Sequence, residues 1–100
     1  MEITRNDIVG DGLKTIWILD FKLNNSEAAA ASVIAAILAA EVTPLMPPAG
    51  PILAALIAAD GAEILSKNQG RGVGANVHYQ VFPPALIPGT AIIKKEYFSL

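Results

Sequence analysis

The amino-acid sequence predicts an α+β fold with the element order β-α-α-β-β, in which a central alanine-rich antiparallel helical hairpin is flanked by one N-terminal strand and two C-terminal strands. Two observations lead to this prediction. Apolar and polar residues alternate near both ends of the chain, which is typical of strands, whereas the middle repeats aliphatic residues and alanines at helical spacing. We expect the 100 residues to form a single domain with three regions, 1–25, 26–69 and 70–100.

The N-terminal region contains one predicted strand. A polar lead with two glycines, Gly10 and Gly12, is followed by the run Leu13–Leu23, in which every second residue faces the same side. The residues on that side are Thr15, Trp17, Leu19, Phe21 and Leu23. Because β-branched and aromatic side chains at a period of two favour a half-buried strand, we expect one here, ended by Asn24 and Asn25.

The middle region is predicted to form the two helices of the hairpin. Alanine, the best helix former, occurs throughout it. Pro44 disfavours helical geometry in the residue before it, so the first helix should end near Val42 or Thr43. Pro51 suits the first turn of the second helix, which we expect to run to about Lys67, with Gly70 as a left-handed cap.

The C-terminal region returns to strand character. Asn76–Phe82 alternates between apolar and polar residues, and Thr90–Phe98 is a second candidate strand. Pro83 and Pro84 lack backbone donors, so the chain around them is a loop or a sheet edge. We therefore expect a small sheet with the helical hairpin on one face.

The most informative feature is an internal repeat. Val33–Glu41 (VIAAILAAE) and Ile52–Asp60 (ILAALIAAD) match position by position, as pairs of large aliphatic residues and pairs of alanines that end on an acid. Side chains four residues apart stack on nearly one helix face, so each helix has an aliphatic ridge and a small-residue face. The ridge residues that we predict to contact another copy or a membrane are Val33, Ile34, Ile37, Leu38, Ile52, Leu53, Leu56 and Ile57.

The repeat allows two interpretations. If the hairpin closes on its small-residue faces, the ridges point outward and a short sheet cannot cover both. Burying each Leu or Ile contributes about 1.5–3 kcal/mol, so outward ridges favour a partner surface. The alternative is an ordinary core, with the hairpin packed on the sheet of the same chain. Oligomerisation is expected there too, because so short a chain buries only about two thirds of its surface.

Composition argues against catalysis, metal or cofactor binding, and nucleic-acid binding. The chain has no Cys, one His and a formal charge of −2, so it lacks both a thiolate site and a basic surface for nucleic acid. His78 has no carboxylates near it in the sequence, and Glu41 and Asp60 are expected to lie apart. Gly70–Gly74 follows a helix instead of preceding one, so it is interpreted as a cap and turn. We predict a non-enzymatic protein without cofactors.

The hairpin is similar in kind to the hydrophobic helical hairpin of pore-forming colicins, in which two alanine-rich apolar helices are joined by a tight turn. The likeness covers the middle region and implies membrane activity.

We predict a small self-associating protein, a homo-oligomer whose apolar hairpin mediates oligomerisation and membrane association, as in a toxin-like or pore-forming protomer. Its partners are then copies of the chain and lipid, with no nucleic acid. The alternative is a structural subunit of a filament, ring or shell with no membrane activity. The polar N-terminus carries no visible secretory signal. The localisation is therefore unknown, with a membrane-associated location and non-classical export left open.

Overall fold

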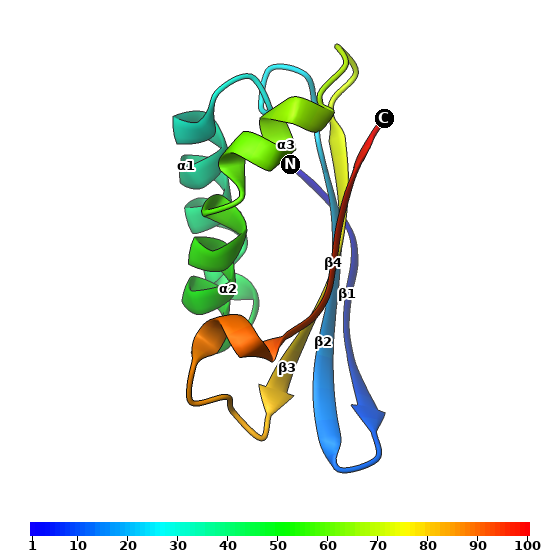
Figure 1. Cartoon of the computed structure of the whole chain (residues 1–100), viewed down its shortest axis with the longest axis vertical. Coiled ribbons are helices and arrows are strands. Elements are labelled where there is room, and N and C mark those ends of the chain that lie inside the picture. The colour runs from blue at the N-terminus through cyan, green and yellow to red at the C-terminus, as the bar shows by residue number, and fades with distance from the viewer.

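In the computed structural model, an antiparallel sheet with the strand order β1-β2-β3-β4 carries a layer of helices on one face (Figure 1). The structure describes residues 1–100, except for the side chain of Asp11. The strands are β1 (Glu2–Asp11), β2 (Lys14–Leu23), β3 (Val73–Phe82) and β4 (Ile92–Ser99). The helices between β2 and β3 are α1 (Ala31–Glu41), α2 (Ala49–Ala58) and α3 (Gly61–Lys67). The short 3-10 helices are η1 (Thr43–Leu45) and η2 (Pro88–Ala91).

The predicted β-α-α-β-β arrangement is wrong, first because the N-terminal region forms two strands instead of one. β1 and β2 form an antiparallel hairpin in which Ile8 pairs with Trp17. Gly12 lies in the turn with a φ of +64°, which glycine adopts without steric cost. β1 lies at the edge of the sheet, and most of its side chains are exposed. A polar sequence suits such an edge strand, but it leaves little apolar alternation to indicate one.

The arrangement is also wrong in its helices, because the second predicted helix is broken in two. α2 ends at Ala58, α3 begins at Gly61, and the two helices are bent by 61°. Gly61 is a weak helix former that lies close to α1, since a Cβ at this position would be 3.2 Å from the Cβ of Ala31. The bend directs α3 toward the sheet, where it contacts β4 (Figure 1).

Most of the large aliphatic residues of the helices pack into the core against the sheet, whereas Val33 and Ile52 are exposed. The fully buried members of the aliphatic ridges are Ile34, Leu38, Leu53 and Ile57. They belong to one core with the inward side chains of β2 and β3, which include Trp17, Leu19, Phe21 and Val77. In the structure, the ridges therefore do not point outward. Burying a large aliphatic side chain contributes more than burying an alanine methyl, so the apolar face of the sheet takes the ridges.

The opposite face of the sheet is free of helices in the described part of the chain (Figure 1). Ile16 and Ile18 alternate with the core residues of β2 and therefore point to this open face. They are nevertheless buried, with 4 % and 7 % exposure, because β2 lies between two other strands. Asp20 lies on the same face and accepts a hydrogen bond from the side chain of Asn76. The open face is thus polar around a small aliphatic centre.

Candidate functional site

The predicted contact residues have very different exposures. Ile34, Leu38, Leu53 and Ile57 are buried, Ile37 and Leu56 are half-buried, and Val33 and Ile52 are exposed at 40 % and 39 %. From their present positions, Val33 and Ile52 present the most surface to a partner. Contact by the buried members would require the helices to leave the sheet. That any of these residues contacts a partner or a membrane stays a prediction.

The exposed residues of α1 and α2 carry no charge. We call this surface the outer helical face and define it by the exposed residues of α1 and α2, which are Ala31, Ser32, Val33, Ala36, Ala39, Ala40, Pro51, Ile52 and Ala55. The face is a consequence of how the repeat packs. Because the large aliphatic residues lie against the sheet, most alanines of the same helices must face outward.

Asp60, the acid that ends the second copy of the repeat, binds β4. Tyr97 donates a hydrogen bond from its hydroxyl to Oδ2 of Asp60 at 2.7 Å, and Nζ of Lys95 lies 2.9 Å from the same oxygen. Burial raises the pKa of the Tyr97 hydroxyl, and the neighbouring carboxylate raises it further. The hydroxyl therefore stays protonated and continues to donate. This cluster joins the α2–α3 bend to the sheet.

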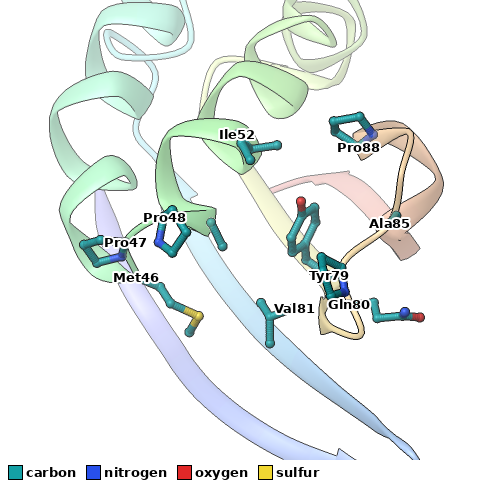
Figure 2. A pocket seen from close by; sticks show the side chains of 11 residues that line it. Met46, Pro47, Pro48, Ile52, Tyr79, Gln80, Val81, Ala85 and Pro88 are labelled. Atoms are coloured by element: carbon teal, nitrogen blue, oxygen red, sulfur yellow. The ribbon is translucent and has the colours of Figure 1, made fainter.

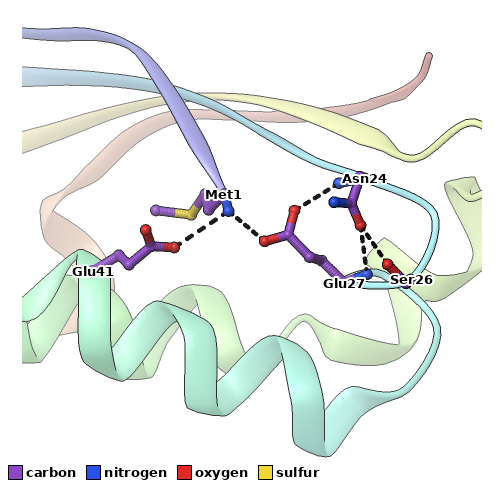
Figure 3. Close-up of polar contacts among 5 residues, drawn as sticks. All are labelled: Met1, Asn24, Ser26, Glu27 and Glu41. Atoms are coloured by element: carbon purple, nitrogen blue, oxygen red, sulfur yellow. Dashed lines mark hydrogen bonds and ion pairs between the residues drawn. The ribbon is translucent and has the colours of Figure 1, made fainter.

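Glu41, the acid that ends the first copy, lies beside Met1 in the folded chain and therefore has different partners. The ammonium group of Met1 binds Glu27 and lies 3.4 Å from the carboxylate of Glu41 (Figure 3). Glu27 also accepts a hydrogen bond from the backbone N–H of Asn24 at 2.9 Å. The hydrogen bonds from Asn24 and Met1 lower the pKa of Glu27, and the bond to Glu27 raises the pKa of the ammonium. These contacts tie β1 to the segment before α1.

The other polar candidates from the sequence lie in separate places. His78 is half-buried on the open face of the sheet, paired with Ile18 in β2 and Lys94 in β4. Arg71 is exposed in the turn before β3, between Gly70 and Gly72, which both have positive φ. Within the residues that the structure describes, no group of three or more His, Cys, Asp and Glu side chains could hold a metal ion.

A pocket of about 220 Å³ lies between the start of α2, the end of β3 and the loop that precedes η2 (Figure 2). Its lining residues are Met46, Pro47, Pro48, Ala49, Ile52, Tyr79, Gln80, Val81, Pro84, Ala85 and Pro88. We call it the proline-lined pocket. In the sequence, these prolines indicate only breaks between elements. Their concentration in two segments was the one available signal, and the fold was needed to bring the segments together.

The β1–β2 turn and the end of β3 lie at the same end of the molecule (Figure 1). Large apolar side chains are exposed in this region. They are Leu13, Phe82, Leu86 and Ile87, with exposures of 94 %, 61 %, 101 % and 67 %. Phe82 pairs with Thr15, which places it beside the β1–β2 turn, and the chain continues from there through Leu86 and Ile87. We call this surface the apolar end.

The chain matches no protein-family model, no curated protein and no solved structure. Within its described residues, no single helix is long and apolar enough to cross a membrane. α2 and α3 meet the criteria of length and composition only as a bent pair. Function must therefore be argued from the surfaces of the molecule.

Proposed function

We propose that this protein is a non-enzymatic, self-associating protein, and that its copies join through the outer helical face. The observation that carries the proposal is the lack of charge on the outer helical face, because the one charged residue of α1 and α2, Glu41, lies at the end of α1 beside the Met1 ammonium. The sheet differs in this respect, because Arg5, Asp7, Lys22, Lys94 and Glu96 are all exposed on its strands.

A second copy of the chain is the occupant that suits this face. Small side chains let two helix layers approach closely, and alanine loses no side-chain entropy when it is covered. The same patch on two copies can meet about a two-fold axis, so one face is enough to form a closed dimer. With a formal charge of only −2, two copies repel each other little.

The edges of the sheet are less suited to association. β1 and β4 are the edge strands, and their exposed charges, such as Arg5 and Lys94, oppose pairing with another strand. The pairings of β1 with β2 and of β3 with β4 also contain register shifts, between Ile3 and Arg5 and between His78 and Tyr79. Such irregularities disfavour the growth of a sheet from copy to copy. The helical layer is therefore the better candidate for the interface.

Sedimentation velocity tests the proposal. The wild-type chain should have a concentration-dependent mass that is a multiple of 10.4 kDa. The double variant Ala36→Lys/Ala55→Lys puts charge on the outer helical face and should sediment as a monomer. Lys is nearly as good a helix former as Ala, so the fold should persist, which circular dichroism would check.

Ala29→Lys is the matched control, because Ala29 is an exposed alanine outside α1 and α2. This variant should associate like the wild type. A wild-type chain that stays monomeric up to high concentration would refute the proposal. So would a folded double variant with an unchanged mass.

Membrane association is a second candidate function, and the apolar end is the observation that favours it. Leu13 and Leu86 project almost completely into solvent, and apolar side chains of this kind can enter the lipid headgroup region. Pore formation would require a larger conformational change, because the helical hairpin would have to leave the sheet and expose Leu38 and Leu53.

Co-sedimentation with neutral and anionic lipid vesicles at pH 7 and pH 5, together with dye release, separates these functions. Binding that is lost in Leu13→Ser/Leu86→Ser but kept in Ala36→Lys/Ala55→Lys supports membrane association through the apolar end. Dye release in addition would support pore formation. Vesicles that do not bind the wild-type chain at either pH would refute both.

A further inference from the structure

The proline-lined pocket contains one polar group, the hydroxyl of Tyr79, that has no hydrogen-bond partner among the described residues. Tyr79 is only 6 % exposed, and its ring stands between α2 and the loop before η2, with the hydroxyl directed into the space between Ile52 and Pro88 (Figure 2). Among the described residues, no group forms a hydrogen bond with this hydroxyl, and burial alone raises the pKa of Tyr79. The hydroxyl therefore has an unused capacity to donate a hydrogen bond to a molecule in the pocket.

The remainder of the lining is apolar and uncharged. Gln80 is the other polar side chain, and its Nε2 already donates to the carbonyl of Pro83 at 2.7 Å. No lining residue carries a charge that would compensate an ionic ligand. Because an unpaired charge is costly to bury, a neutral ligand suits the pocket better than an ion.

The size and stiffness of the pocket limit the ligand further. An engineered apolar cavity of about 150 Å³ in another protein binds benzene. At about 220 Å³, this pocket has room for a six-membered ring with a short substituent. Four prolines in the lining, Pro47, Pro48, Pro84 and Pro88, fix their own φ angles and hold the walls in place. A preformed pocket loses little conformational entropy when a ligand enters it.

We propose that the proline-lined pocket binds a small neutral molecule with an apolar ring and a single carbonyl or ether oxygen, and that this oxygen accepts a hydrogen bond from the hydroxyl of Tyr79. The apolar walls contact the ring, and the hydroxyl fixes its orientation. This inference goes beyond self-association. The outer helical face and the pocket share Ile52, but Ala36 and Ala55, the two positions changed in the double variant, do not line the pocket.

The test uses two probes of nearly the same shape, 4-fluoroacetophenone and 1-ethyl-4-fluorobenzene, titrated into the full chain and followed by ¹⁹F NMR. Both should show saturable binding, but only the ketone has an oxygen to accept from Tyr79. Tyr79→Phe keeps the ring and removes the donor. It should weaken the binding of the ketone by about three- to tenfold and leave the binding of the hydrocarbon unchanged.

Two further variants locate the binding. Ala85→Phe places a ring in the pocket and should abolish the binding of both probes. Leu86→Ala changes the neighbouring residue, which is fully exposed and does not line the pocket, so both affinities should be retained. This control distinguishes the pocket from general adhesion to the apolar end.

The absence of saturable binding by the wild-type chain would overturn the inference. It would also be overturned if Tyr79→Phe affected both probes equally or neither of them, or if Ala85→Phe left binding intact. Repeating the titration with Ala36→Lys/Ala55→Lys keeps the two proposals separate. That variant should bind the probes like the wild type, whatever its oligomeric state.

Discussion

Tyr97 and Asp60 are joined by a 2.7 Å hydrogen bond that connects the sheet to the bend between α2 and α3. Tyr97 is 5 % exposed, so the donor is buried, and Oδ2 of Asp60 is also bound by Lys95. The acid at the end of the repeat is therefore an anchor between the two layers. Because its partners lie on β4, a strand at the far end of the sequence, the helical layer is held to the sheet at this edge.

Tyr97→Phe should lower the free energy of unfolding by about 1–3 kcal/mol, because it leaves a partly buried carboxylate without its hydroxyl donor. Lys95→Met is the comparison. It should cost less than about 1 kcal/mol, since the Lys95 side chain is 32 % exposed and solvent screens the ion pair. Urea unfolding measures both variants. A cost for Lys95→Met that equals or exceeds that of Tyr97→Phe would contradict the role given to the hydroxyl.

The contact of the Met1 ammonium with Glu27 predicts that the free energy of unfolding depends on pH in two ranges, which we call the acid limb and the alkaline limb. The pKa of Glu27 is lowered from its ordinary value of 4.5. Its contribution to the stability of the fold is therefore present above pH 4.5 and is lost as the pH falls through the lowered pKa. The pKa of the ammonium is raised from 8.0, so its contribution is present below pH 8.0 and is lost as the pH rises through the raised pKa.

Glu27→Gln should reduce both limbs, whereas acetylation of the Met1 amine should remove the alkaline limb and only weaken the acid limb, because the backbone N–H of Asn24 still lowers the pKa of Glu27. Urea unfolding between pH 2 and pH 11 would measure the effect in all three proteins. An unchanged acid limb in Glu27→Gln would show that other groups cause it.

The sequence predicts strands well where one face is buried and poorly where neither is. Lys14–Leu23 alternates because its odd-numbered residues enter the core, and the predicted strand lies there. β1 has no such pattern, although the Asp-Gly pair before Leu13 is a hairpin signal that could have indicated it. The break at Gly61 was not predicted either, because a single glycine only weakens a helix, and the close approach of Ala31 to this position is a feature of the tertiary fold.

The candidate sites follow the same division. The repeat shows that each helix has one face of large aliphatic residues and one face of small residues. Which of the two faces is buried depends on packing against the sheet, which the repeat does not indicate. The proline-lined pocket could not be predicted, because Pro48 and Pro84 come from segments that only the tertiary fold brings together. In the sequence, Tyr79 has the pattern of an ordinary aromatic residue in a strand, because nothing near it indicates that its hydroxyl has no partner.

The orientation of the helices predicts a contrast between two ridge residues of α1. Leu38 is fully buried, so Leu38→Ala should cost about 2–5 kcal/mol. Val33→Ala removes less from the core, because Val33 is 40 % exposed, and alanine is the better helix former. Its cost should be within about 0.5 kcal/mol of zero. Similar costs for the two variants in thermal unfolding would mean that the ridge does not face the sheet.

The turn between α3 and β3 offers a comparison of two glycines with similar backbones. Gly70 has a φ of +92° and Gly72 a φ of +100°, and the N–H of each donates to Oδ1 of Asn68 at 3.1 Å. Alanine at either position is strained by the positive φ, at a cost of about 1–2 kcal/mol. The surroundings differ, because no atom lies within 4 Å of a Cβ at Gly70, whereas a Cβ at Gly72 would lie 2.1 Å from the carbonyl oxygen of Leu23.

Gly70→Ala should therefore show the backbone strain alone, and Gly72→Ala should cost about 1–3 kcal/mol more. The obstructing atom belongs to the backbone of β2, so relief would require the ends of β2 and β3 to separate. Amide exchange should accordingly speed up at Val73 in Gly72→Ala and stay unchanged in Gly70→Ala. Equal unfolding free energies for the two variants would show that β2 and β3 are not packed this closely at the turn.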